Sequence, residues 1–207
     1  MIDIKIISPE ILAPEIEGLT FRYFQGESDY PVIKNVFDRC KEVDPVEQTL
    51  KIEDMHHHFD HIINCDPDTD MIFAEVNGEP IAYSRVSWDK EGNGDYIYHS
   101  LGWIVPEWRR KGIGTAILEW DENRLLEIAE EHPYDAPKFF RAYIDDKLKA
   151  HTALFKRAGY KPIRYFFEMT RPVDAPLLEA PMPAGLEIRP VEEAHMPLIW
   201  EAMHEAF

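Results

Sequence analysis

The chain has 207 residues, of which 45% are hydrophobic and 12% aromatic, so it predicts one domain of roughly 150 residues with a packed core and excludes disorder. Its formal net charge of −17, from 39 acidic and 22 basic residues, excludes general binding to nucleic acids or anionic membranes, which need a broad basic surface. No apolar run approaches the roughly 20 residues of a membrane span, and the polar start is not a signal peptide. Cys40 and Cys65 lie in no metal or disulfide pattern, which favours free thiols in a reducing cytoplasm.

The first elements predicted are a strand and two helices. Residues 19–25 are rich in aromatic and β-favouring side chains and predict a strand. A helix is expected after Ser28 and Asp29, which can cap it. A second helix is predicted over about 51–63, since apolar residues recur there at helical spacing.

The middle of the chain predicts three antiparallel strands in succession. Residues 71–76 and 81–88 flank Asn77-Gly78, a pair typical of the type I′ hairpin turn because both residues accept positive φ. A looser turn containing glycine then leads into a strand over about 95–105.

The following segments predict alternating helices and strands. A helix is expected over about 113–131, a strand over 138–144, a helix over 146–158 and a closing strand over 164–170. The order is β-α-α-β-β-β-α-β-α-β. It indicates an α/β (α+β) fold, with a central, mostly antiparallel mixed sheet and helices on both faces.

The end of the chain predicts a linker and a partial repeat. Residues 172–184 hold four prolines and indicate a stiff, extended linker. The sequence at 185–189 is similar to that at 18–22, and an apolar helical pattern follows both. We therefore expect a first domain over 1–171 and the first strand and helix of a truncated second copy over 185–207. The alternative is chance similarity between two strand–helix units.

The stretch from Trp103 to Leu118 predicts an anion site. Pro106 ends a strand because proline cannot donate to a sheet ladder. Gly112 and Gly114 allow close approach to the backbone, and the helix that begins there offers unpaired N–H groups to a pyrophosphate. Three consecutive basic residues stand beside them: Arg109, Arg110 and Lys111.

The spacing Arg109-x-x-Gly112-x-Gly114 resembles the [RQ]-x-x-G-x-[GA] signature of the GNAT N-acetyltransferases, over roughly residues 19–171. The spacings of Walker and dinucleotide-binding loops are absent, which disfavours a nucleotide-binding protein. The resemblance implies a GNAT fold, acetyl-CoA as cosubstrate, no metal, and direct attack by the primary amine of a small molecule or peptide. The cofactor-binding residues that it implies are Trp103, Ile104, Val105, Arg109, Arg110, Lys111, Gly112, Ile113, Gly114, Thr115 and Phe155.

The resemblance also implies catalytic positions on the strand before the loop. Tyr98 falls where some relatives carry a catalytic glutamate. His99, on the opposite face, could be a base near neutral pH. The backbone N–H near Ile104 would polarise the thioester carbonyl. The alternative for Tyr98 and His99 is a purely structural place in the sheet.

One position departs from the family pattern. Relatives commonly carry on the later helix a tyrosine that protonates the leaving thiolate, and Phe155 occupies that position here, although Gly159-Tyr160 fits the end of the motif. Water, His151 or another group would then protonate the thiolate. Alternatively, the domain binds CoA with little or no catalysis and supports a sister domain or a second copy of the chain.

Four histidines form the other visible cluster, at positions 56, 57, 58 and 61. His57 and His61 have the i, i+4 spacing that can hold a metal ion. No acidic or cysteine ligand is placed obviously nearby, so a polar wall of the acceptor pocket or an exposed helix face is the interpretation we favour, with no metal.

Overall fold

The computed structural model describes residues 9–176 and 179–206. They divide into two compact units, with the boundary between Lys161 and Pro162. The first unit contains a five-stranded sheet and its helices, and the second contains a C-terminal helix. The domain limits predicted from the sequence, at 171–172 and 184–185, stay predictions.

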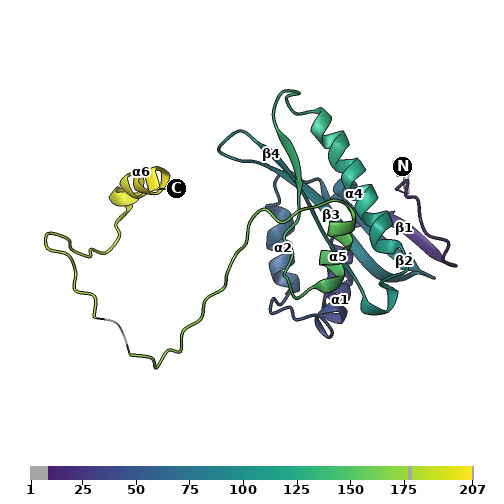
Figure 1. Ribbon diagram of the computed structural model, residues 1–207, viewed down its shortest axis with the longest axis horizontal. Helices are drawn as coiled ribbons and strands as arrows, with labels where there is room; N and C mark the ends of the chain where they lie inside the picture. The colour runs from purple at the N-terminus through teal and green to yellow at the C-terminus, as the bar shows by residue number, and fades with distance from the viewer. Residues whose placement is uncertain (1–8, 177–178, 207) are drawn as a thin grey trace. The chain divides into compact units, whose positions relative to one another are not determined.

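The sheet has its strands in chain order, β1-β2-β3-β4-β5 (Figure 1). Neighbouring strands are antiparallel except for β4 and β5, which are parallel. This agrees with the predicted mixed, mostly antiparallel sheet. The strands are β1 Leu19–Tyr23, β2 Met71–Val76, β3 Glu79–Lys90, β4 Tyr96–Ile104 and β5 Lys138–Arg141.

The turn between β2 and β3 has the predicted geometry. Asn77 and Gly78 have φ values of 50° and 80°, so both turn positions are left-handed, as a type I′ turn requires. The turn fixes the register of the hairpin from which the rest of the sheet extends.

The helices of the first unit are α1 Tyr30–Lys41, α2 Ile52–Asp60, the short α3 Pro67–Asp70, α4 Ile113–Glu130 and α5 Lys149–Arg157. The second unit contains α6 Met196–Ala206. Three 3-10 turns complete the described elements: η1 Gly26–Asp29, η2 Pro106–Trp108 and η3 Glu193–His195.

Helices cover both faces of the sheet. Ser84 of β3 donates to Asp121 of α4 at 2.7 Å, so even-numbered residues of this part of β3 face α4. Trp103 of β4 points to the other face, where its ring meets that of Phe37 of α1 at 5.0 Å. The hydrophobic core lies between the sheet and these helices. Its fully buried members include Val36, Ile72, Phe73, Ile81, Val86, Val105, Ile113 and Leu125.

Two predicted strands are absent. Residues 164–170 and 185–189 have no strand pairing in the structure. Tyr165, Phe167 and Met169, which would form the buried face of such a strand, are exposed. A strand is stable only when a neighbour bonds its backbone, and no described segment pairs with either stretch. Strand β5 likewise ends at Arg141 rather than at residue 144.

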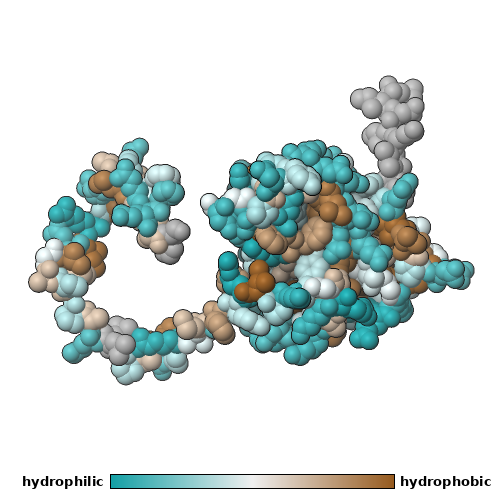
Figure 2. Space-filling view, turned by 45° about the horizontal axis from the view of Figure 1, so that its top comes forward, coloured by the Kyte–Doolittle hydropathy of each residue, from teal (hydrophilic) through white to brown (hydrophobic). Residues whose placement is uncertain are grey.

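The surface of the first unit is largely hydrophilic on the face that Figure 2 shows, with apolar patches between the polar side chains. Within residues 9–176 and 179–206, the longest and most apolar helices still fall short of what a membrane span requires.

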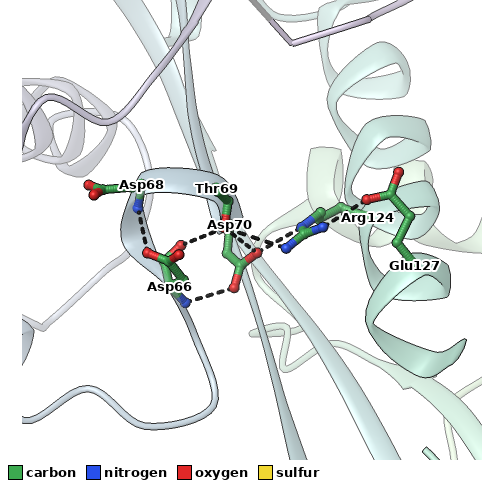
Figure 3. A network of polar contacts seen from close by, with 6 residues as sticks. All are labelled: Asp66, Asp68, Thr69, Asp70, Arg124 and Glu127. Carbon is green, nitrogen blue, oxygen red and sulfur yellow. Dashed lines mark hydrogen bonds and ion pairs between the residues drawn. The ribbon is translucent and has the colours of Figure 1, made fainter. Parts of the chain in front are cut away.

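A polar network joins α3 to α4 (Figure 3). The buried carboxylate of Asp70 accepts from Arg124 Nε at 2.8 Å and from the amide of Asp66 at 2.7 Å. Arg124 also pairs, at 2.8 Å, with Glu127, whose side chain is 65% exposed. The same guanidinium therefore has one buried and one exposed acidic partner.

We expect Asp70→Asn to lower the free energy of unfolding by about 1–3 kcal/mol, because it weakens a buried, charge-assisted hydrogen bond. Glu127→Gln is the matched control and should cost less than about 0.5 kcal/mol, since exposed ion pairs are weak. Urea unfolding followed by circular dichroism measures both. Equal losses for the two variants would contradict this account of the network.

Candidate functional site

The loop between β4 and α4 has an unusual backbone. Arg110 and Gly112 have φ values of 62° and 89°, so the residues on either side of Lys111 are both left-handed. Such alternation turns successive N–H groups toward one side and forms a concave nest for an anion. Gly114 brings the start of α4 close to β4, since a Cβ at this position would lie 3.1 Å from Ile104 Cδ1.

Most amides of this loop have no protein acceptor. Within the described residues, no hydrogen bond is made by the N–H groups of Arg110, Lys111 and Gly112. Those of Ile113 and Gly114 belong to the first turn of α4, where no intrahelical carbonyl is available. Thr115 differs, because its amide donates to Gly112 O at 3.0 Å. The open amides thus run from Arg110 to Gly114.

Arg109 holds the loop in place. Its guanidinium forms a two-pronged ion pair with Asp44, at 2.9 and 2.6 Å, and its Nε donates to Ile104 O at 2.8 Å. Burial by itself would lower the pKa of Arg109, but the hydrogen bonds and charge of Asp44 raise it above the ordinary value. Since Asp44 neutralises this arginine, its main role is to fix the end of β4 against the loop.

The other basic side chains of the loop are exposed. Arg110 is exposed, and the Lys111 ammonium lies 4.0 Å above the ring of Trp108. A cavity of about 290 Å³ opens beside the loop, with Arg157 of α5 on its far wall. Its lining residues are Ile104, Arg109, Arg110, Gly112, Gly114, Thr115, Ala150, His151, Leu154 and Arg157.

Strand β4 loses its partner on one side before it reaches this loop. Strand β5 pairs with β4 only from Tyr96 to His99. The Val105 amide donates to Ile81 O at 2.9 Å, which makes Ala82–Ile104 and Ser84–Gly102 the non-hydrogen-bonded pairs of the β3–β4 ladder. The peptide groups of Gly102 and Ile104 therefore point away from β3, into the gap beyond the end of β5.

A second cavity, of about 50 Å³, lies along this gap. It shares Ile104, Gly114, His151 and Leu154 with the first cavity. The two spaces therefore adjoin and follow β4 from the loop toward Ser100. The remaining lining residues are Tyr83, Ser84, Ser100, Gly102, Trp103, Ile117, Leu118, Asp121 and Phe155.

Asp121 is the most unusual group in the second cavity. It is 1% exposed, and its Oδ2 accepts from the hydroxyls of Ser84, at 2.7 Å, and Ser100. Its Oδ1 is buried and has no partner within the described residues. Burial raises the pKa of Asp121 to about 7.

Sequence reasoning missed Asp121, although a signal was present. The residue stands four positions after Ile117 and four before Leu125, in the apolar stripe of the predicted helix. An acidic residue at such a place is rare unless it has a specific role.

His151 and Phe155 of α5 complete the wall. His151 lines both cavities, and burial lowers its pKa. Its Nε2 lies 3.4 Å from Gly102 O, and its ring meets that of Trp103 at 5.4 Å. Phe155, at the family's tyrosine position, is 9% exposed and lines the second cavity without a hydroxyl.

Tyr98 and His99 lie on opposite faces of β4, and neither is in the lining of the two cavities described above. The Tyr98 hydroxyl contacts His132 Nδ1 at 2.7 Å, and burial raises its pKa. His99 lies at the last position where β4 pairs with β5, opposite Arg141. Its Nε2 is 3.1 Å from Asp89 Oδ2, and burial lowers its pKa despite that carboxylate.

The predicted cofactor-binding residues divide into two groups. Val105 and Ile113 are fully buried in the core and line neither cavity, and Lys111 also lies outside both linings. The others line at least one cavity, namely Trp103, Ile104, Arg109, Arg110, Gly112, Gly114, Thr115 and Phe155.

The four clustered histidines lie on α2 and at its C-terminal end. The rings of His57 and His61 lie 4.4 Å apart, and His61 Nδ1 contacts His57 O at 2.9 Å. Within the described part of the chain, no group of three or more histidine, cysteine or acidic side chains is placed to hold a metal ion.

Solved structures with the same fold are acetyltransferases. A GCN5-related N-acetyltransferase from Sphaerobacter thermophilus is 20% identical, with a TM-score of 0.71 over 93% of this chain and 59% of that protein. The chain thus spans 59% of the length of this relative. The Salmonella typhimurium protein yncA, solved with its cofactor acetyl-CoA, is 15% identical, with a TM-score of 0.54 over 70% of this chain and 80% of that protein.

A predicted acetyltransferase from Clostridium acetobutylicum, solved with acetyl-CoA, is 15% identical, with a TM-score of 0.51 over 73% of this chain and 96% of that protein. No curated protein matches the chain. The family model for the acetyltransferase (GNAT) domain matches residues 67–162, which include β2 to β5, the loop and α5. Residues 67–162 thus match the acetyltransferase (GNAT) domain, and the chain has the fold of these acetyltransferases.

Proposed function

We propose that this domain transfers an acetyl group from acetyl-CoA to the primary amine of a small molecule or peptide, in a cytoplasmic setting. The observation that carries the proposal is the set of open backbone N–H groups. It comprises the amides of Arg110 to Gly114 and those of Gly102 and Ile104, which point away from β3. The acetyl-CoA bound by two proteins of the same fold supports the choice of ligand.

The loop would hold the diphosphate of CoA. Its open amides and the positive end of the α4 dipole favour an anion. Arg110 and Arg157 add charge at the lining of the larger cavity, whereas Arg109 is already paired with Asp44. Binding in a chain of net charge −17 would therefore depend on this local basic site rather than on the overall charge.

The pantetheine arm would act as an additional strand beside β4. The N–H groups of Gly102 and Ile104 point into the gap beyond β5, where the carbonyls of an amide-containing chain can accept from them. Gly102 has no room for a side chain on its α4 side, since a Cβ would lie 2.9 Å from Tyr83 O. The thioester would then lie along the smaller cavity, with a main-chain amide polarising its carbonyl.

The amine would approach from the face of the sheet opposite α4. His99 lies on that face, one position before the gap opens, and Asp89 orients its ring. A neutral histidine there can accept a proton from the attacking amine. Tyr98 lies on the α4 face and bonds His132, so a direct catalytic role for it is not supported by its position.

A second candidate function is a CoA-binding domain with little catalysis, in a tandem protein. Phe155 at the tyrosine position favours it, and so does the greater length of the Sphaerobacter relative. The partial repeat supports it only in part, because α6 forms but residues 185–189 do not form a strand. CoA release across a panel of amines separates the two functions.

We expect the wild-type chain to bind CoA and Gly114→Val to bind it at least about 10-fold more weakly in titration calorimetry. The valine side chain would enter both cavities, since the Cβ alone already lies 3.1 Å from Ile104 Cδ1. Gly92→Val is the matched control, because a Cβ at Gly92 meets no atom within 4 Å and the residue lines neither cavity. If the wild-type chain does not bind CoA, the proposed function is wrong.

We expect His99→Gln to lower kcat by about 100-fold, the size of a general-base effect. Tyr98→Phe, its neighbour on the other face, should change kcat by less than about 3-fold. Burial lowers the pKa of His99, and the groups around it are Asp89, Arg141, Glu91 and Tyr143. On the acidic side, wild-type kcat should therefore fall below about pH 6.5, where the base gains its proton. His99→Gln should lack this fall. If the pH profile of kcat is the same in the variant as in the wild type, His99 is not the base.

A further inference from the structure

The second cavity contains a carboxyl group that the fold does not explain. Among the buried acidic residues, Asp29 pairs with Arg22 and Asp70 with Arg124. Asp121 differs, because no cation pairs with it in the described chain and its Oδ1 is left without a partner. A buried polar atom without a partner is costly, so Oδ1 is a site where a bound molecule or water would add a favourable hydrogen bond.

We propose that Asp121 is the proton donor to the thiolate of CoA that leaves during acetyl transfer. The proposal rests on the proposed function, since it needs a thioester lying along β4. It assigns to α4 the role that the family's tyrosine has on α5, where this chain carries Phe155.

The position of Asp121 suits this role. It lines the same cavity as Gly102 and Ile104, whose peptide groups would hold the end of the pantetheine arm. Phe155 lines that cavity as well, so the position of the missing hydroxyl and the Asp121 carboxyl share one space. The sulfur of a thioester placed there would have Asp121 as its nearest acidic group within the lining.

The hydrogen bonds of Asp121 leave one oxygen for the proton. Ser84 and Ser100 both donate to Oδ2, so Oδ1 is the atom that can carry the acidic hydrogen. A pKa of about 7 keeps a large fraction of the group protonated near neutral pH. The other titratable groups around it are Glu122, whose charge raises this pKa, His151 across the cavity, and Tyr160, which bonds Glu122.

The proton balance closes without any further reactant. The amine nitrogen forms a bond to the carbonyl carbon, and the carbon–sulfur bond breaks with its electron pair on sulfur. Asp121 Oδ1 gives its proton to the sulfur, and the free thiol of CoA results. The carboxylate then regains a proton from solvent, which receives the proton that the amine has lost through His99. The net reaction moves one proton from the amine to the sulfur.

Asp121→Asn is the principal test, because asparagine keeps the shape and can accept the two serine hydrogen bonds while it lacks the acidic proton. We expect its Kd for CoA to stay within about 3-fold of wild type and its kcat to fall by about 100-fold. The double variant Asp121→Asn, Phe155→Tyr should recover at least 10-fold of that loss, because the tyrosine hydroxyl supplies an acid in the same cavity. Wild-type kcat should fall above about pH 7, and Asp121→Asn should lack this fall.

Asp70→Asn is the matched control, since it removes a buried carboxylate that lies outside both cavities and should leave kcat unchanged. If the wild-type chain is active and Asp121→Asn is equally active, Asp121 is not the proton donor, but the proposed function stands. Lost activity without recovery in the double variant would also overturn it and would indicate a structural role. A wild-type chain that binds CoA but releases none from acetyl-CoA with any amine would overturn both proposals.

Discussion

Strand β4 continues beyond the end of β5, and the rest of the site depends on this loss of pairing. Strand β5 pairs with β4 only as far as His99, and the peptide groups of Gly102 and Ile104 then point into a gap. The N–H groups of these two residues have no strand partner there, and N–H groups within a domain need an acceptor. The walls of the gap come from α4 and α5, and Arg109 holds its end by joining Ile104 O to Asp44. Ligand binding would complete the sheet at this point.

The two faces of β4 would divide the chemistry. On the α4 face, the cavities contain the loop amides, Asp121 and Phe155, which suit a thioester and its leaving group. On the opposite face, His99 and Asp89 form a pair suited to accepting a proton. Successive residues of a strand alternate between its two faces. A proton donor on one face and a proton acceptor on the other can therefore lie close to the same stretch of β4.

Much of the first unit could be predicted from the sequence, because its signals are local. Asn77-Gly78 fixed the hairpin, and Gly112 and Gly114 placed the loop before the helix. Residues 164–170 have equally strong local strand character, yet they form none, because pairing depends on a partner and not on the segment itself. Asp121 and the Arg109–Asp44 pair depend on contacts between residues far apart in the chain, which periodicity does not report.

The most direct test of the central claim is amide hydrogen exchange of the wild-type chain, followed by NMR with and without saturating CoA. We expect CoA to slow exchange at Gly102, Ile104 and the loop amides from Arg110 to Gly114. The Val105 amide, which already bonds Ile81 O, should change little and serves as an internal reference. If CoA binds and exchange at Gly102, Ile104 and the loop amides is unchanged, CoA does not bond these groups, and the proposed site is wrong.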